Sequence, residues 1–274
     1  IASGICGDNI LWQLDKYGVL TVKGGGVLSD LSGCALYKNM VSKIVFSEGI
    51  TMTEIPIEGF KDYVHLKEFN ILPGVETIGE CAFSGCKSLT SISIPDSVAS
   101  IGSSAFSGCD AISAVHISSM EKWLALSFGG ARANPLHPGA ALYLNGELVT
   151  EAVFADGTTK IGCTFSGCTS LTSITIPDSV TSIGDDAFRG CTGLTSITIP
   201  DSVTSIGRET FRGCTGLTSI TIPDGVTSIK GSTFYGCSSL TSITIPESVT
   251  SIGKWAFYGC SSLTSIMIPD SVTS

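Results

Sequence analysis

Hydrophobic and polar positions follow one pattern that returns every 23 residues over most of the chain. The unit is LxxIxIPxxVxxIGxxAFxxCxx, and the copy that starts at Leu171 shows it clearly. The alternation in I-x-I predicts a short strand in which every second side chain is buried. Pro177 lacks a backbone donor and ends the strand, and Asp178-Ser179 is typical of a turn. A second apolar step and a bend at Gly184 complete what we expect to be one coil.

One such coil cannot bury its own apolar side, whereas a stack of coils can, because each coil covers the next. The same register is found from about residue 41 onward, with one long interruption. We therefore expect a β-rich repeat solenoid that is stabilised by contacts between neighbouring coils. Its strands should start near residues 41, 66, 89, 112, 149, 171, 194, 217, 240 and 263.

Residues 1–40 depart from the repeat and predict an N-terminal capping module. From Asn9 the sequence reads NILWQLDKYGVLTVKGG, which is two alternating apolar stretches around a turn and is typical of a β-hairpin. A hairpin would cover the open side of the first coil. Cys6 and Cys34 flank it, and either a disulfide between them or two separate thiols fits the sequence.

A second departure, residues 118–148, separates repeats at 41–117 from repeats at 149–274. Its first part predicts a short helix that is capped by Ser118 or Ser119 and carries Trp123 inward. A loop should follow, and Asn145-Gly146 predicts a hairpin. We expect about 30 residues to leave the solenoid and rejoin it, either as a binding surface or as a tolerated surface excursion.

The repeat at this period resembles the BspA-like leucine-rich repeats, also called the Treponema pallidum type. The N-terminal SGICGDNILWQLDKYGVLTVKGGG resembles the cap of such proteins in gut anaerobes, and the segment from Trp123 to Gly162 resembles an insert that recurs in them. The resemblance implies a right-handed, curved solenoid with a parallel sheet on its concave face. It also implies a secreted or surface-anchored protein, of a family whose best-studied members are adhesins for host matrix proteins or other bacteria.

Composition limits the classes of partner. The chain is 43% hydrophobic and only 14% charged, yet its apolar residues come in short groups, so no membrane-spanning segment is expected. The net charge of −9 and the lack of a basic cluster argue against nucleic acid as a partner. The chain begins at Ile1, so we expect a removed signal peptide or an internal segment, and it ends in mid-repeat, so we expect a truncated or uncapped end.

The residues that often carry chemistry do not converge. Cys168, Cys191, Cys214, Cys237 and Cys260 recur at steps of 23 residues and form a column rather than a metal site, so we interpret them as buried apolar fillers. The three histidines belong to no catalytic set, and we expect no enzymatic activity, no cofactor and no metal. Two alternatives remain open: a calcium-bridged column of strand-exit carboxylates, and ice binding by the regular threonines.

The outward positions of the expected strands differ along the chain. Downstream they are small hydroxyls and upstream they vary, and specific recognition needs varied side chains. We therefore place a specific site in the N-terminal half of the concave face, near the insertion. The binding candidates upstream are Lys43, Lys67, Glu68, Asn70, His116 and Trp123; in the hydroxyl columns they are Thr172, Thr175, Thr195 and Thr198.

Two functions fit this pattern. The first is a monomeric interaction module, extracellular or on the cell surface, that adheres to an extracellular protein or glycan. The second is a structural stalk that holds another domain away from the cell, which the near-identity of residues 167–274 supports.

Overall fold

The computed structural model describes residues 2–7, 9–28, 32–137 and 139–274. Residues 1, 8 and 29–31 of the predicted cap and residue 138 of the predicted insertion lie outside this part. The chain forms two compact units, Ile1–Glu147 (unit 1) and Leu148–Ser274 (unit 2), and each is described by itself. The division lies beside the predicted return of the repeat at residue 149.

The repeat coils form as the apolar pattern predicts, and together they make a β-solenoid. In the coil that starts at Leu171 every leucine, isoleucine, valine, alanine, phenylalanine and cysteine position of the pattern is buried, and the same positions are buried in the coil that follows it. The phenylalanines of successive coils stack face to face: Phe60, Phe83 and Phe106 in unit 1, and Phe188, Phe211, Phe234 and Phe257 in unit 2, with ring centroids 5.2–5.7 Å apart. The core is therefore a set of parallel side-chain columns rather than one cluster.

The cap of unit 1 contains the predicted hairpin, β2 (Ile10–Leu14) and β3 (Val19–Gly24). The Asp15 carboxylate closes its turn by accepting hydrogen bonds from the backbone N–H groups of Tyr17 and Val19, at 2.8 and 2.9 Å. A further strand, β1 (Ala2–Gly7), pairs antiparallel with β2. Because β3 pairs in parallel with the first repeat strand, the cap extends the sheet of the solenoid.

Short elements connect the cap to the first coil. The helix α1 (Ser32–Ala35) packs against β1, and η1 (Lys38–Met40) leads into the first repeat strand. Cys34 on α1 and Cys6 on β1 are both buried, and the disulfide between them stays a prediction. The strand β4 (Gly26–Val27) pairs with β6 (Ile50–Thr51).

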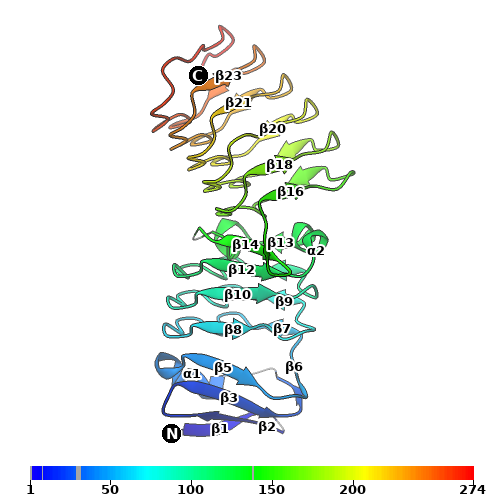
Figure 1. Ribbon diagram of the computed structural model, residues 1–274, viewed down its shortest axis with the longest axis vertical. Helices are drawn as coiled ribbons and strands as arrows, with labels where there is room; N and C mark the ends of the chain where they lie inside the picture. Colours follow the sequence, from blue (N-terminus) through cyan, green and yellow to red (C-terminus); the bar gives the residue numbers. More distant parts are fainter. Residues whose placement is uncertain (1, 8, 29–31, 138) are drawn as a thin grey trace. The chain divides into compact units, whose positions relative to one another are not determined.

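The main sheet of unit 1 has the order β1-β2-β3-β5-β8-β10-β12-β14-β15, and Figure 1 shows its repeat strands side by side in chain order. The strands after the cap are β5 (Lys43–Phe46), β8 (Glu68–Asn70), β10 (Ser91–Ile94), β12 (Ala114–Ile117), β14 (Ala141–Leu144) and β15 (Glu147–Leu148). The second apolar step of each coil forms a smaller parallel sheet of β7 (Glu54–Ile55), β9 (Thr77–Ile78), β11 (Ser100–Ile101) and β13 (Ser127–Phe128).

The segment 118–148 does not leave the solenoid as predicted. It contains the expected helix, α2 (Met120–Ala125), whose N-cap Ser119 accepts a hydrogen bond from the Lys122 N–H, and the turn η2 (Ala131–Ala133). However, β13 pairs with β11 and β14 pairs with β12, both in parallel register, so the segment supplies a longer coil. Its apolar residues take the places of a repeat without matching the 23-residue spacing. The predicted Asn145-Gly146 turn, with φ of 50° and 88°, leads from β14 to β15.

Unit 2 repeats the same two series of short parallel strands. The first series is β16 (Glu151–Val153), β18 (Ser173–Thr175), β21 (Ser219–Thr221) and β23 (Ser242–Thr244). The second is β17 (Lys160–Ile161), β19 (Ser182–Ile183), β20 (Ser205–Ile206), β22 (Ser228–Ile229) and β24 (Ser251–Ile252). The strands expected near 194 and 263 are not regular strands, although Leu194, Ile197 and Ile199 are buried as predicted. The apolar pattern fixes which side chains are buried, but it does not fix the geometry of the ladder hydrogen bonds.

The cysteine column is buried, as predicted, and also bonds one coil to the next. Cys191 donates its backbone N–H to the carbonyl of Phe188, and the thiol of Cys214, one coil later, donates to the same carbonyl at 3.0 Å. The same thiol-to-carbonyl bond recurs at 3.0–3.1 Å for Cys86, Cys109, Cys191, Cys237 and Cys260. A cysteine at this position therefore fills apolar space and satisfies a second lone pair of a buried carbonyl.

We predict that Cys214→Ala lowers the free energy of unfolding by about 1–2 kcal/mol, since it removes a buried sulfur and one inter-coil hydrogen bond. Urea unfolding followed by circular dichroism measures this change. The exposed neighbour Thr215→Ala is the control and should stay within about 0.5 kcal/mol of the parent. An equal stability for Cys214→Ala and Thr215→Ala would show that the thiol bond contributes nothing.

The same column predicts a loss of stability in alkali. Burial raises the pKa of the Cys237 thiol from 9.0 to about 12, with the neighbouring Cys260 contributing less. The unfolded chain loses this proton near pH 9 while the folded chain keeps it, so stability falls as the pH rises from 9 towards 12. Urea midpoints should be lower at about pH 10.5 than at about pH 8. Cys237→Ala should reduce that difference, and an unchanged difference would contradict the assignment.

Candidate functional site

The outward side chains of the main sheet of unit 1 form a continuous surface, here called the sheet face. The strand register places them in three rows. One row runs through Ser3, Gln13, Thr21, Val45, Asn70, Ser93, His116 and Tyr143. A second row, on one side of the first, contains Ile5, Leu11 and Lys23 in the cap. A third row, on the other side, starts at Val19 and contains Lys43, Glu68, Ser91, Ala114 and Ala141 in the coils. The sheet face thus mixes apolar, charged and aromatic side chains, whereas a uniform repeat would present one type.

Two of the predicted residues lie next to each other on this face. Lys43 on β5 and Glu68 on β8 are register partners, and their side chains form a salt bridge of 3.3 Å. Both are exposed, so the pair contributes at most about 1 kcal/mol to stability and mainly orients two charges towards solvent. Lys67 is exposed just before β8, and its carbonyl accepts a hydrogen bond from the hydroxyl of Thr90. Asn70 is exposed on β8.

His116 packs against an aromatic partner that the sequence analysis missed. Its ring stacks on that of Tyr143, with centroids 5.1 Å apart and an interplanar angle of 27°. The two residues are register partners on β12 and β14. Tyr143 could have been found only by recognising that the alternation around it continues the main sheet.

Trp123 is not part of a binding surface. It lies on α2 with 1% of its surface exposed and packs edge to face against Phe128, with ring centroids 5.5 Å apart. The helix turns it into the coil, which agrees with its predicted inward direction and excludes it as a binding candidate. Its role is to fill the core of the longer coil.

The threonine columns of unit 2 have a structural use. The hydroxyl of Thr172 donates to the carbonyl of Thr150, and that of Thr218 donates to the carbonyl of Thr195, at 3.0 and 3.2 Å. Thr175 and Thr198 are exposed in the second hydroxyl position. The hydroxyls of Thr172 and Thr218 thus support the ladder between coils.

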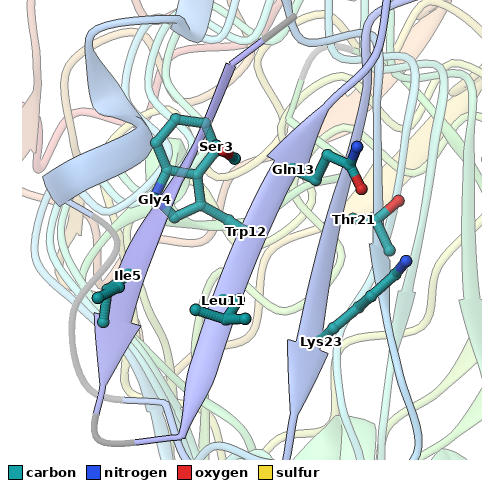
Figure 2. A pocket seen from close by; sticks show the side chains of 8 residues that line it. All are labelled: Ser3, Gly4, Ile5, Leu11, Trp12, Gln13, Thr21 and Lys23. Atoms are coloured by element: carbon teal, nitrogen blue, oxygen red, sulfur yellow. The ribbon is translucent and has the colours of Figure 1, made fainter.

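The cap end of the sheet face carries an open hollow of about 410 Å³, here called the cap hollow. Figure 2 shows its side chains in two rows across β1, β2 and β3, with Ile5, Leu11 and Lys23 in one row and Ser3, Gln13 and Thr21 in the other. Ile5 and Leu11 are 72% and 57% exposed although both are apolar. No repeat pattern marks them, because both lie in the cap, and β1, which carries Ile5, was not predicted.

The packing of Trp12 beneath the cap hollow depends on Gly4. Trp12 is buried and its indole lies against Gly4. Its ring packs against that of Tyr37, with ring centroids 5.5 Å apart. A Cβ atom on Gly4 would lie 2.7 Å from the indole Nε1 and 2.8 Å from Cε2. Glycine is therefore required on β1 so that the tryptophan can pack beneath the hollow.

The described residues contain neither a metal-binding cluster nor a membrane-spanning helix. Within residues 2–7, 9–28, 32–137 and 139–274, no group of three or more His, Cys, Asp or Glu side chains could hold a metal ion. In the same part of the chain no helix has the length and apolar character needed to cross a bilayer.

Comparisons with known proteins agree with this architecture. The family model of the BspA type leucine rich repeat region matches residues 31–128 and 150–274. A leucine-rich repeat protein from Eubacterium ventriosum is similar over 99% of this chain and 92% of its own, at 21% identity and a TM-score of 0.54, which shows the fold.

Two further solved structures are similar at lower TM-scores. A leucine-rich repeat protein from Bacteroides ovatus has 26% identity over 97% of this chain and 82% of its own, at a TM-score of 0.43. A leucine rich cell surface protein from Faecalibacterium prausnitzii has 23% identity over 96% of this chain and 94% of its own, also at 0.43. No curated protein matches the chain.

We predict that Gly4→Ala lowers the free energy of unfolding of unit 1 by about 1–3 kcal/mol, because the added methyl group overpacks the Trp12 ring. The measurement is a urea titration followed by tryptophan fluorescence. Ser3→Ala, on the exposed neighbouring position, is the control and should leave the midpoint unchanged. Coincident curves for the two variants would refute the packing role of Gly4.

Proposed function

Because the chain belongs to the BspA-type leucine-rich repeat family, we propose that it is a non-enzymatic interaction module that binds another protein through the sheet face of unit 1. The observation that carries this proposal is the exposed apolar pair Ile5 and Leu11 in the cap hollow. These residues are register partners on β1 and β2, so they form one patch rather than two isolated side chains.

The cap hollow has the composition of a small protein-binding centre. Binding free energy at protein interfaces concentrates in a few apolar or aromatic side chains that a polar rim shields from water. Here Ile5 and Leu11 would be the anchors, and Ser3, Gln13, Thr21 and Lys23 would form the rim. When a partner covers apolar side chains this exposed, their removal from water makes the free energy of binding more favourable.

The rest of the sheet face would supply specificity. The Lys43–Glu68 pair and the His116–Tyr143 stack present charge and aromatic area at fixed positions along the strands. Rigid strands hold these groups without the entropy cost of ordering a loop. The varied rows therefore support selective binding at the half of the chain where the sequence predicted it.

We further propose that the module acts outside the cell, as a monomer, on a host or bacterial surface protein. Family membership supports this location, and cell fractionation followed by protease shaving of intact cells tests it. A chain that is protected from protease in intact cells would contradict an exposed location.

A stalk is the second candidate, and one observation favours it. In unit 2 the outward hydroxyls of Thr172, Thr218 and Thr241 are used in bonds to the preceding coil, so this part of the strand surface is occupied by the scaffold itself. A stalk would need that regularity and no ligand. The two roles can coexist in one chain, with recognition by unit 1 and spacing by unit 2.

We predict that Ile5→Ser combined with Leu11→Ser weakens binding to a protein partner at least about tenfold, because both anchors are lost. A solid-phase screen of the full chain against fibronectin, fibrinogen, laminin, mucin and a glycan array identifies the partner. Val153→Ser, an exposed apolar residue on β16 of unit 2, is the matched control and should bind like the parent.

The outcomes separate the alternatives. Saturable binding to a protein that the double variant loses supports the proposal, whereas equal binding by the double variant contradicts it. Binding to glycans alone overturns the assignment to a protein partner. If the chain is shown to be folded and binds no member of the panel, the result favours the stalk.

A further inference from the structure

The turns of unit 2 carry a surface that is independent of the sheet face. At one position of the turn after the second short strand, successive coils hold Arg189, Arg212, Tyr235 and Tyr258, at steps of 23 residues. Coils of unit 1 form the same turn with Ser84 and Ser107 at this position. The coil itself therefore does not require an arginine or an aromatic residue here.

These side chains stack on one another. The guanidinium of Arg212 lies 4.6 Å from the centroid of the Tyr235 ring, and Tyr235 stacks on Tyr258 with centroids 5.1 Å apart and an angle of 22°. On the same turn, the ammonium of Lys254 lies 4.2 Å from the centroid of the Trp255 ring. Two cations are thus held against two aromatic groups by cation–π contacts.

Trp255 is displayed at a conformational cost. Its φ is 61°, in the left-handed region that bulky residues rarely adopt. The corresponding position of other coils has the same conformation but holds small or acidic residues: Cys81, Ser104, Asp186, Glu209 and Ser232. Burial does not offset the strain, since 56% of the Trp255 surface is exposed. Strained residues that persist at an exposed position point to a binding role.

The four side chains Arg212, Tyr235, Trp255 and Tyr258 enclose a hollow of about 330 Å³, here called the aromatic hollow. This volume is at the lower end of ligand sites and suits one or two sugar rings. Aromatic rings offer apolar surface to the C–H groups of a sugar, while the phenol, indole N–H and guanidinium groups at their edges donate hydrogen bonds to its hydroxyls.

The local charge selects among sugars. The chain has a net charge of −9, yet three of its four arginines, Arg189, Arg208 and Arg212, lie in unit 2. Arg189 and Arg212 are both held by Glu209, at 2.8 and 3.2 Å. Arg212 has five donor N–H groups, so it keeps donors for a ligand, and Lys254 adds a second positive charge beside the hollow.

From this arrangement we propose that the aromatic hollow of unit 2 binds a carboxylated saccharide, such as a sialic acid or hexuronate residue at the end of a glycan. The sugar ring packs on the aromatic groups and its carboxylate faces Arg212 and Lys254. This site does not depend on the protein-binding role of unit 1, so each can fail without the other.

The test uses the full chain and a matched pair of sugars. 3′-Sialyllactose and a hyaluronan hexasaccharide carry carboxylates, and lactose lacks the sialic acid of the first. Trp12 and Trp123 are buried, so the acrylamide-accessible fluorescence comes from Trp255 and reports on the aromatic hollow. We expect saturable protection of this emission by at least one acidic probe, none by lactose, and weaker binding at high salt.

Substitutions that other coils already contain keep the fold. Trp255→Ser introduces the residue found at position 232, and Tyr258→Ser the residue found at 84 and 107. Each should weaken binding of the acidic probe, measured by calorimetry, at least about tenfold. Tyr17→Ser removes an exposed tyrosine that Lys16 covers at 5.0 Å in the cap, and this matched control should bind like the parent.

Three outcomes would overturn the proposal. They are lactose binding as tightly as sialyllactose, parent-like binding by folded Trp255→Ser, and no binding of either acidic probe at millimolar concentration. The combined Ile5→Ser and Leu11→Ser variant should bind the acidic probe like the parent. That result separates this site from the sheet face.

Discussion

The apolar side of each coil can be covered only by the coil beside it, and the rest of the structure depends on that contact. A 23-residue coil has no second layer of its own, so its leucine, isoleucine, phenylalanine and cysteine side chains pack on the same residue types one period away. Backbone bonds follow the same direction. The Thr204 N–H donates to the Thr181 carbonyl, and the Phe211 N–H donates to the Thr233 carbonyl of the following coil. Each coil is therefore held from both sides, and stability is the sum of many similar interfaces.

The thiol column shows how finely this contact is built. A carbonyl such as that of Phe188 accepts one bond from its own coil and one from the next, and only a small side chain with a donor can make the second bond in apolar surroundings. Burial keeps the thiols neutral by raising the pKa of residues such as Cys191 and Cys214. Packing and hydrogen bonding are thus supplied by the same atom.

Much of the fold follows from the sequence because the repeated pattern averages out local ambiguity. Ile174, Phe188 and Cys191 are buried as expected, and the Asp15 turn forms where its residues predict it. The thiol-to-carbonyl bonds were not predictable, because they depend on the separation of two coils rather than on either coil. The path of residues 118–148 was missed for a related reason: β14 joins the sheet through register with β12, which a changed spacing hides.

The candidate surfaces were less predictable than the core. The sequence placed Lys43, Glu68 and His116 on an outward face, and the structure adds Tyr143 as the partner of His116. Ile5 and Leu11 lie on two cap strands, β1 and β2, that have no repeat signature, and only the sheet register brings them together. The turn at Trp255 was not identified from the sequence for a different reason. Its distinguishing feature is a tryptophan with a positive φ, and a backbone angle cannot be read from the amino-acid sequence.

Because the interface between coils is uniform, the buried residues and the surface residues can evolve independently. Since the inward residues of one coil fit any neighbour of the same pattern, duplication or loss of a 23-residue segment in the gene leaves every remaining interface intact. Outward positions, such as the one held by Glu209, Ser232 and Trp255 in successive coils, can then change one coil at a time. The number of coils and the side chains on their outer surface can therefore change independently during evolution. Both the length of the solenoid and its binding surface can vary without any change in the core residues.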